Sequence, residues 1–246
     1  MSDGADPAGP TSAPMRPLFI PRGLVMLASG WVFASWLLIF GLRPPVQPQA
    51  ASYGPNIQML LVMIGVGIGI AWPLLRLSGA PSRAPLAQSA IDGISLLVLL
   101  QVVIWPLRLV TSWTLPRTVA VVAAAAAAIM LVAAVLALSM RARSGRTRAA
   151  WMAALCALAL LPMAADAACA LLPDESDSAA CSAALSPWML PWSAPALLAR
   201  FSEPSTIDPG AAERAVLVHA FAFASAIWLV SAIASLAPRG PREAAA

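Results

Sequence analysis

The sequence contains no lysine, so all fifteen of its basic residues are arginines, against eleven acidic residues. Without lysine the chain can form neither a Schiff base nor the phosphate contact of a P-loop. A single histidine, His219, excludes bis-histidine haem ligation and ordinary multi-histidine metal sites. The three cysteines, Cys156, Cys169 and Cys181, form no CxxC pair, which excludes a dithiol redox motif. We therefore expect no cofactor and no bound metal.

Charge is also scarce. Only 11% of the residues are charged, 60% are hydrophobic, and the mean hydropathy is +0.81. A soluble domain carries about 25% charged residues, so the composition excludes that class. The net charge of +4 does not indicate nucleic acid as a partner, because the arginines flank apolar segments. Missing lysine and abundant alanine are typical of a high-GC bacterial coding bias, so we expect a multi-pass protein of the bacterial plasma (inner) membrane.

Six apolar stretches approach the length of about 20 residues that a helix needs to cross the bilayer core. They predict an all-α integral membrane protein in which residues 24–237 form one six-helix membrane domain. Residues 1–23 and 238–246 are expected to be cytoplasmic tails, the first of them disordered because it is rich in Gly, Pro, Ser and Asp. The predicted spans are 24–42, 57–77, 91–110, 118–140, 149–172 and 215–237.

The orientation of the spans follows from the placement of the arginines. With the N-terminus in the cytoplasm, ten arginines fall on the inner side and five on the outer side. The short connection that holds Arg141, Arg143, Arg146 and Arg148 is where the positive-inside rule is most reliable. An even number of spans then returns the C-terminus to the cytoplasm. The other connections are short, apart from one.

The exception is the outer segment 173–214, between the fifth and sixth spans. It begins with the acidic stretch Pro173–Asp177 and continues with Ser186–Pro195, where prolines at every fourth residue prevent a continuous helix. Trp188 and Trp192 supply amphipathic rings. Pro195 fits the first turn of a short helix, Pro195–Phe201. We expect the segment to lie on the outer membrane surface or to cap the bundle.

Polar residues inside the spans are informative, because an ionisable group in hydrocarbon costs roughly 2.5–3.5 kcal/mol on insertion scales. Asp166 and His219 lie at matched depths near the outer ends of successive antiparallel spans. They form either a functional pair that handles protons or substrate, or a buried hydrogen bond that locks two helices together. Gln101 could join the same cluster. Asp92, near the inner end of its span, is expected to cap its helix or to pair with Arg83.

Gly65 and Gly69 have the GxxxG spacing that lets two helices approach closely. This spacing serves either a dimer or subunit contact, or ordinary packing within the chain. Cys169 and Cys181 would both face the oxidising side of the membrane, and we predict a disulfide between them. The competing interpretation is that Cys169 is simply a small apolar residue of its helix.

The sequence lacks the catalytic residues of the enzyme classes that share this topology. An intramembrane serine protease would need a Gly-x-Ser motif in the fourth span, where the sequence offers only Ser139, at the cytoplasmic end. A membrane phosphotransferase of the Asp-Gly type would need several aspartates downstream of Asp92-Gly93, and they are absent. We find no catalytic motif and expect a non-enzymatic protein.

Six helices, both termini inside and about 250 residues are similar to the permease subunits of ABC-2-type exporters, including haem-exporter subunits. The resemblance covers helix count and orientation and no diagnostic motif. The family also has an amphipathic helix before the first span, of which this sequence offers at most the short stretch Met15–Arg22. It implies partnership with other membrane subunits and with a separate ATPase, since the chain has no Walker motif. The alternatives are a small secondary carrier or proton-coupled protein that uses Asp166 and His219, and a structural subunit of a membrane complex.

Overall fold

The computed structural model describes residues 21–42, 50–79, 84–142, 144–172, 174, 180–181, 189–203 and 208–236. Those residues form helices and contain no strand, so the predicted all-α class is confirmed for the part described. Six of the helices are long and apolar enough to cross a membrane. The long helices are α1 (Arg22–Leu42), α2 (Ala50–Val66) continued by η1 (Gly67–Ala71) and α3 (Trp72–Ser78), α4 (Pro85–Val110), α5 (Leu115–Ser139), α6 (Gly145–Cys169) and α9 (Ala211–Leu236).

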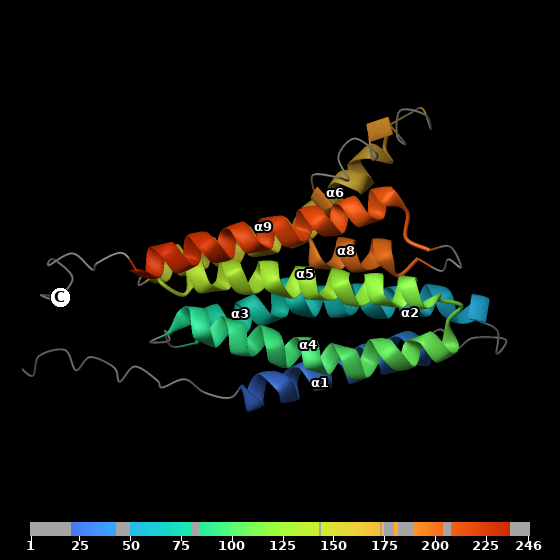
Figure 1. Cartoon of the computed structure of the whole chain (residues 1–246), viewed down its shortest axis with the longest axis horizontal. Helices are drawn as coiled ribbons and strands as arrows, with labels where there is room; N and C mark the ends of the chain where they lie inside the picture. Colours follow the sequence, from blue (N-terminus) through green and yellow to red (C-terminus); the bar gives the residue numbers. More distant parts are fainter. Residues whose placement is uncertain are drawn as a thin grey trace, which may run out of the picture.

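Helix α5 is the central helix of the bundle. About 72% of its apolar window is buried, against 17–22% for α1, α4, α6 and α9. Figure 1 shows α5 between α9 on one side and α4 on the other, and these are its two most extensive contacts. Its run Ala123–Ala128 explains the close approach, because methyl side chains let neighbouring helices come near its backbone.

The second span is continuous but changes its hydrogen-bonding pattern in the middle. At η1 the α-helix becomes a π-helix over Gly67–Ala71 and then resumes as α3. Gly67 faces Trp31 of α1, because a β-carbon at position 67 would lie 2.9 Å from the Trp31 Nε1 atom. The indole N–H of Trp31 donates to the Met63 carbonyl at 2.8 Å, which fastens α1 to α2.

The segment between α6 and α9 enters the bundle. It contains η2 (Leu190–Trp192) and α8 (Ala194–Phe201), and α8 packs mainly against α2 and α5. Leu197, Leu198 and Phe201 are completely buried. This part of the segment therefore neither lies flat on a surface, where one face would stay exposed, nor only caps the bundle, because its start packs against Gly65 inside it.

Some predicted features lie outside the described residues. These are almost all of the N-terminal tail and of Met15–Arg22, the C-terminal tail, Arg83, Arg143, Trp188 and most of the acidic stretch Pro173–Asp177. Within that stretch Asp174 is described, and it is exposed. The short helix predicted at Pro195–Phe201 begins one residue earlier, at Ala194, because the Ser193 side chain caps it.

Two arginines tie helix ends together at the end of the bundle where α1 begins, which we call the arginine end. The Arg148 guanidinium donates to the Gly79 carbonyl at 2.6 Å, joining α6 to the end of α3. The Arg141 guanidinium donates to the Ser231 carbonyl at 3.0 Å, joining α5 to α9. The opposite end, where α6 finishes and α9 starts, we call the disulfide end.

Candidate functional site: a short helix that reaches mid-span

The start of α8 lies at the middle of the second span. Gly65 is the thirteenth of the 26 residues in the membrane-length helix Tyr53–Ser78. A β-carbon on Gly65 would lie 2.6 Å from the Cα atom of Pro195 and 2.9 Å from the carbonyl carbon of Ala194. Any side chain at position 65 would therefore collide with backbone. The chain enters the bundle from the disulfide end, turns at this depth and returns as α8.

Gly69 lies one helical turn further along and also faces this turn. A β-carbon there would make ordinary contacts of 3.4–3.6 Å with the side chains of Ala159, Ala194 and Pro195. The GxxxG pair therefore packs within the chain, against α8 and α6, which is one of the two interpretations that the spacing left open.

The backbone of this turn has polar partners, as a buried irregular segment requires. The Ser193 hydroxyl donates to the Ala159 carbonyl of α6 at 2.6 Å and accepts from the Ala196 N–H at 3.3 Å. Near the other end of α8, the Gln58 side chain donates to the Ala199 carbonyl at 3.1 Å. Hydrogen bonds thus hold both ends of α8, one to α6 and one to α2.

A buried arginine closes the site at the disulfide end. Arg117, in the first turn of α5, is 3% exposed and donates to both carboxylate oxygens of Glu213 on α9, at 2.9 and 3.0 Å. It also donates to the Arg200 carbonyl at 3.4 Å, where α8 ends. Thr114 and Asp208 form a further hydrogen bond of 2.7 Å beside this ion pair. One side chain therefore fixes the ends of three helices.

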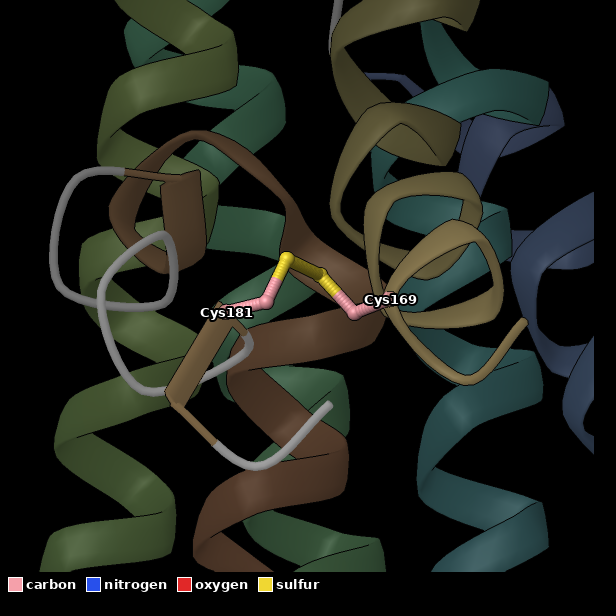
Figure 2. Close-up of a disulfide and its surroundings, with 2 residues drawn as sticks. All are labelled: Cys169 and Cys181. Atoms are coloured by element: carbon pink, nitrogen blue, oxygen red, sulfur yellow. A yellow bond between two sulfur atoms is a disulfide. The ribbon is translucent and has the colours of Figure 1, made fainter. Parts of the chain in front are cut away.

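A disulfide joins Cys169, at the end of α6, to Cys181. Figure 2 shows the bridge between α6 and the short helical turn that carries Cys181. The Cα atoms are 5.8 Å apart, within the usual range for a disulfide. Cys156, the third cysteine, is free. The bridge anchors Cys181, twelve residues after the last residue of α6, to the end of that helix.

A second buried ion pair lies at the arginine end. The carboxylate of Asp92 is completely buried and accepts from the Nε and NH2 groups of Arg76, and also from the Gln88 amide at 3.0 Å. Asp92 is the eighth residue of α4, so it does not cap that helix as one of the expectations had it. The partner is on α3, and the expected partner, Arg83, lies outside the described residues. The pair joins α3 to α4.

The structure does not bring the predicted polar cluster together. Asp166 on α6 and His219 on α9 are both exposed, and no hydrogen bond or ion pair joins these two described residues. Figure 1 shows the C-terminal half of α6 leaning away from the rest of the bundle. Gln101 is on α4, where it accepts from the Trp105 indole at 2.9 Å.

The described residues around Gly65 and Pro195 pack helices closely together, and they include no group of catalytic side chains. Trp192 of η2 packs against Phe223 of α9 with ring centroids 5.0 Å apart and the ring planes tilted by 47°. Trp192 also borders a cavity of only about 20 Å³ between α5 and α6. Among the described residues no group of three or more His, Cys, Asp or Glu side chains is placed to hold a metal ion. The site is built mainly from small and apolar groups.

Sequence reasoning missed Arg117 as a site residue and counted it only as an outer arginine. One signal could have identified it. Glu213 is the acidic residue in the first turn of α9, at the same end of the bundle as Arg117. A carboxylate and an arginine at the boundary of two antiparallel spans are natural partners.

Comparison with known proteins gives no assignment. No protein family, no curated protein and no solved structure matches the chain.

Proposed function

We propose that the chain is a non-enzymatic, permease-like subunit of the bacterial plasma membrane, with both termini in the cytoplasm, that works together with other chains. The observation that carries this proposal is the short helix α8, whose start lies against Gly65 at mid-span. Transport proteins build their pathways from membrane segments that are interrupted near the bilayer midplane. Six membrane-length helices are compatible with such a role.

The arrangement of α8 supports a moving part better than a purely structural one. The helix has eight residues, fewer than half of what crossing the membrane requires. Two side-chain hydrogen bonds and the Arg117 cluster hold it between longer helices, and each of these contacts can break without unfolding a span. In the structure α8 fills the bundle, and in this proposal that arrangement is the closed state of the permease.

The carrier alternative receives no comparable support. It requires Asp166 and His219 to share one site, and both side chains lie on the exposed surface of helices that the structure does not pair through them. A purely structural subunit would need no segment that enters from one side and returns.

The test is to purify the full chain with a C-terminal tag from its native membranes in mild detergent, and to identify the co-purifying chains by mass spectrometry. A stoichiometric ATPase is expected. Its ATP hydrolysis in proteoliposomes should fall severalfold for Gly65→Ala and stay unchanged for Gly69→Ala. A chain that purifies alone, or an ATPase indifferent to Gly65→Ala in a folded complex, would contradict the proposal.

A further inference from the structure

A cavity of about 280 Å³ lies between α1, η1 with the start of α3, and α4. Its wall consists of aliphatic side chains, glycine, alanine and two tryptophans, Trp31 and Trp72. An engineered apolar cavity of about 150 Å³ binds benzene, so this cavity has room for a larger ligand. It borders η1, and such π-helical turns are frequent at functional sites.

The wall of the cavity carries a buried polar group whose hydrogen-bonding capacity is unused. Trp72 is 2% exposed, and its indole N–H finds no acceptor among the residues that the structure describes. The N–H of Trp31 differs, because it donates to the Met63 carbonyl at 2.8 Å. A buried donor without an acceptor is costly, and most such groups have a partner in folded proteins. The N–H of Trp72 therefore marks a place where an acceptor from another molecule would bind favourably.

Water is a poor occupant of this cavity. A buried water molecule typically makes about three hydrogen bonds to polar groups around it. Apart from the two tryptophans, the side chains of the wall have no polar atom, and the Trp31 N–H is already engaged. A water bound to Trp72 would thus find no second side-chain partner in the wall. The acceptor should instead belong to a molecule whose remaining surface is apolar.

Such a molecule can reach the cavity from the bilayer beside α1. Leu27 lines the cavity and is still 53% exposed. Helix α1 is loosely packed, with only Leu24, Ser35 and Ile39 buried along its 21 residues. A lipid-soluble ligand can therefore enter sideways, between α1 and its neighbours.

We propose that the cavity binds a flat, lipid-soluble carbonyl compound, such as a quinone, whose carbonyl oxygen accepts a hydrogen bond from Trp72. The two indole rings in the wall favour a planar apolar body. A saturated hydrocarbon chain would fill the volume but would leave the Trp72 N–H unpaired. A charged ligand would find no counter-charge among the side chains of the wall. This site is independent of the permease proposal, because it involves neither α8 nor a partner chain.

The test compares duroquinone with durene, two flat molecules with the same carbon skeleton, of which only the quinone has carbonyl oxygens. Equilibrium dialysis of the purified full chain in detergent, with empty micelles as the blank, gives a Kd for each probe. Because the probes partition differently into micelles, the ratio of the two Kd values is compared between variants. Trp72→Phe keeps an aromatic ring and removes the N–H, so it should weaken duroquinone relative to durene by about fivefold, the equivalent of one hydrogen bond.

The matched control is Trp105→Phe, at an indole that donates to Gln101 outside the cavity, and it should leave the ratio unchanged. An unchanged ratio in Trp72→Phe would overturn the proposal. So would an equal change in Trp105→Phe. If Trp72→Phe does not elute as a single folded species, infrared spectroscopy of the wild type decides. The carbonyl stretch of bound duroquinone should lie at a lower wavenumber than in dodecane, and an unshifted band would contradict the hydrogen bond.

A further variant tests the cavity itself. Ala28→Phe places a ring in the cavity and should weaken the binding of both probes severalfold. Val102→Phe, at an exposed position of α4 outside the cavity, should bind them as the wild type does. Equal binding by these two variants, both of them folded, would show that the probes bind elsewhere and would overturn the proposal.

Discussion

Gly65 lies against the backbone of Pro195, at the midpoint of the second membrane-length helix, with no room for a β-carbon between them. The neighbour is backbone at the start of α8, so it cannot rotate away as a side chain could. The contact therefore fixes both the depth of α8 and the identity of residue 65.

The first prediction concerns this contact. Gly65→Ala should destabilise the protein by about 1–3 kcal/mol, the usual cost of overpacking. Gly69→Ala is the control, since its β-carbon meets only ordinary contacts and Ala favours a helix over Gly. The measurement is the Tm of both variants in the same detergent. Equal Tm values would show that α8 is not seated against Gly65.

The second prediction concerns the ion pair between Arg76 and Asp92. Asp92→Asn leaves the guanidinium of Arg76, which is 27% exposed, without its carboxylate. Because water reaches this side chain, the stability loss should stay below roughly 3–5 kcal/mol, the cost of breaking a fully buried pair. Replacing both residues together, by Arg76→Met and Asp92→Leu, should recover most of the lost stability, because no buried charge is left unpaired. Tm values of the single and double variants decide this. A double variant no better than Asp92→Asn would argue against the pairing.

The third prediction concerns Asp166 and His219. The structure does not join these residues, so the changes in Tm caused by Asp166→Asn and His219→Ala should simply add in the double variant. A double variant that loses clearly less than the sum would mean that the two side chains meet in the membrane, and it would revive the carrier alternative.

The fourth prediction is that the disulfide between Cys169 and Cys181 persists in protein isolated without reductant. Non-reducing peptide mapping should give one linked peptide with both residues, and Cys156 should be alkylated as a free thiol. Removing the bridge by Cys169→Ser should cost about 3 kcal/mol, as chain entropy predicts for a loop of this length. Three alkylated cysteines in the unreduced protein would exclude the bridge.

The fifth prediction concerns orientation. Alkaline phosphatase fused after Ser178 should be active, and fusions after Ser144 or Arg239 should be inactive, because the arginine-rich connection stays in the cytoplasm. High activity of the Ser144 fusion would invert the topology.

Local signals in the sequence predicted the elements of this fold well. Each span is a largely apolar stretch of about membrane length, and the prediction of six helices long and apolar enough to cross a membrane is confirmed. The helix at Pro195–Phe201 was predicted to within one residue, since Pro195 near its start is a local signal. The disulfide partners followed from their position on one side of the membrane.

Contacts between distant residues were less predictable. The fit of Gly65 against Pro195 depends on a partner 130 positions away, which the GxxxG spacing cannot specify. Matched depth suggested a pair of Asp166 and His219, but depth says nothing about rotation around the helix axis. Packing sets that rotation, and it leaves both side chains exposed.

The position of α8 also constrains the order in which the chain assembles during synthesis. The helix is too short to stay in lipid by itself, and the side-chain hydrogen bonds at its two ends reach α2, α5 and α6. We therefore expect α8 to enter a groove that those helices have already formed, from the disulfide end and after α6 is in place. Only then can Arg117 reach Glu213 and seat α9. A chain that ends before residue 213 would therefore lack the Glu213 carboxylate that pairs with Arg117 at the end of α8.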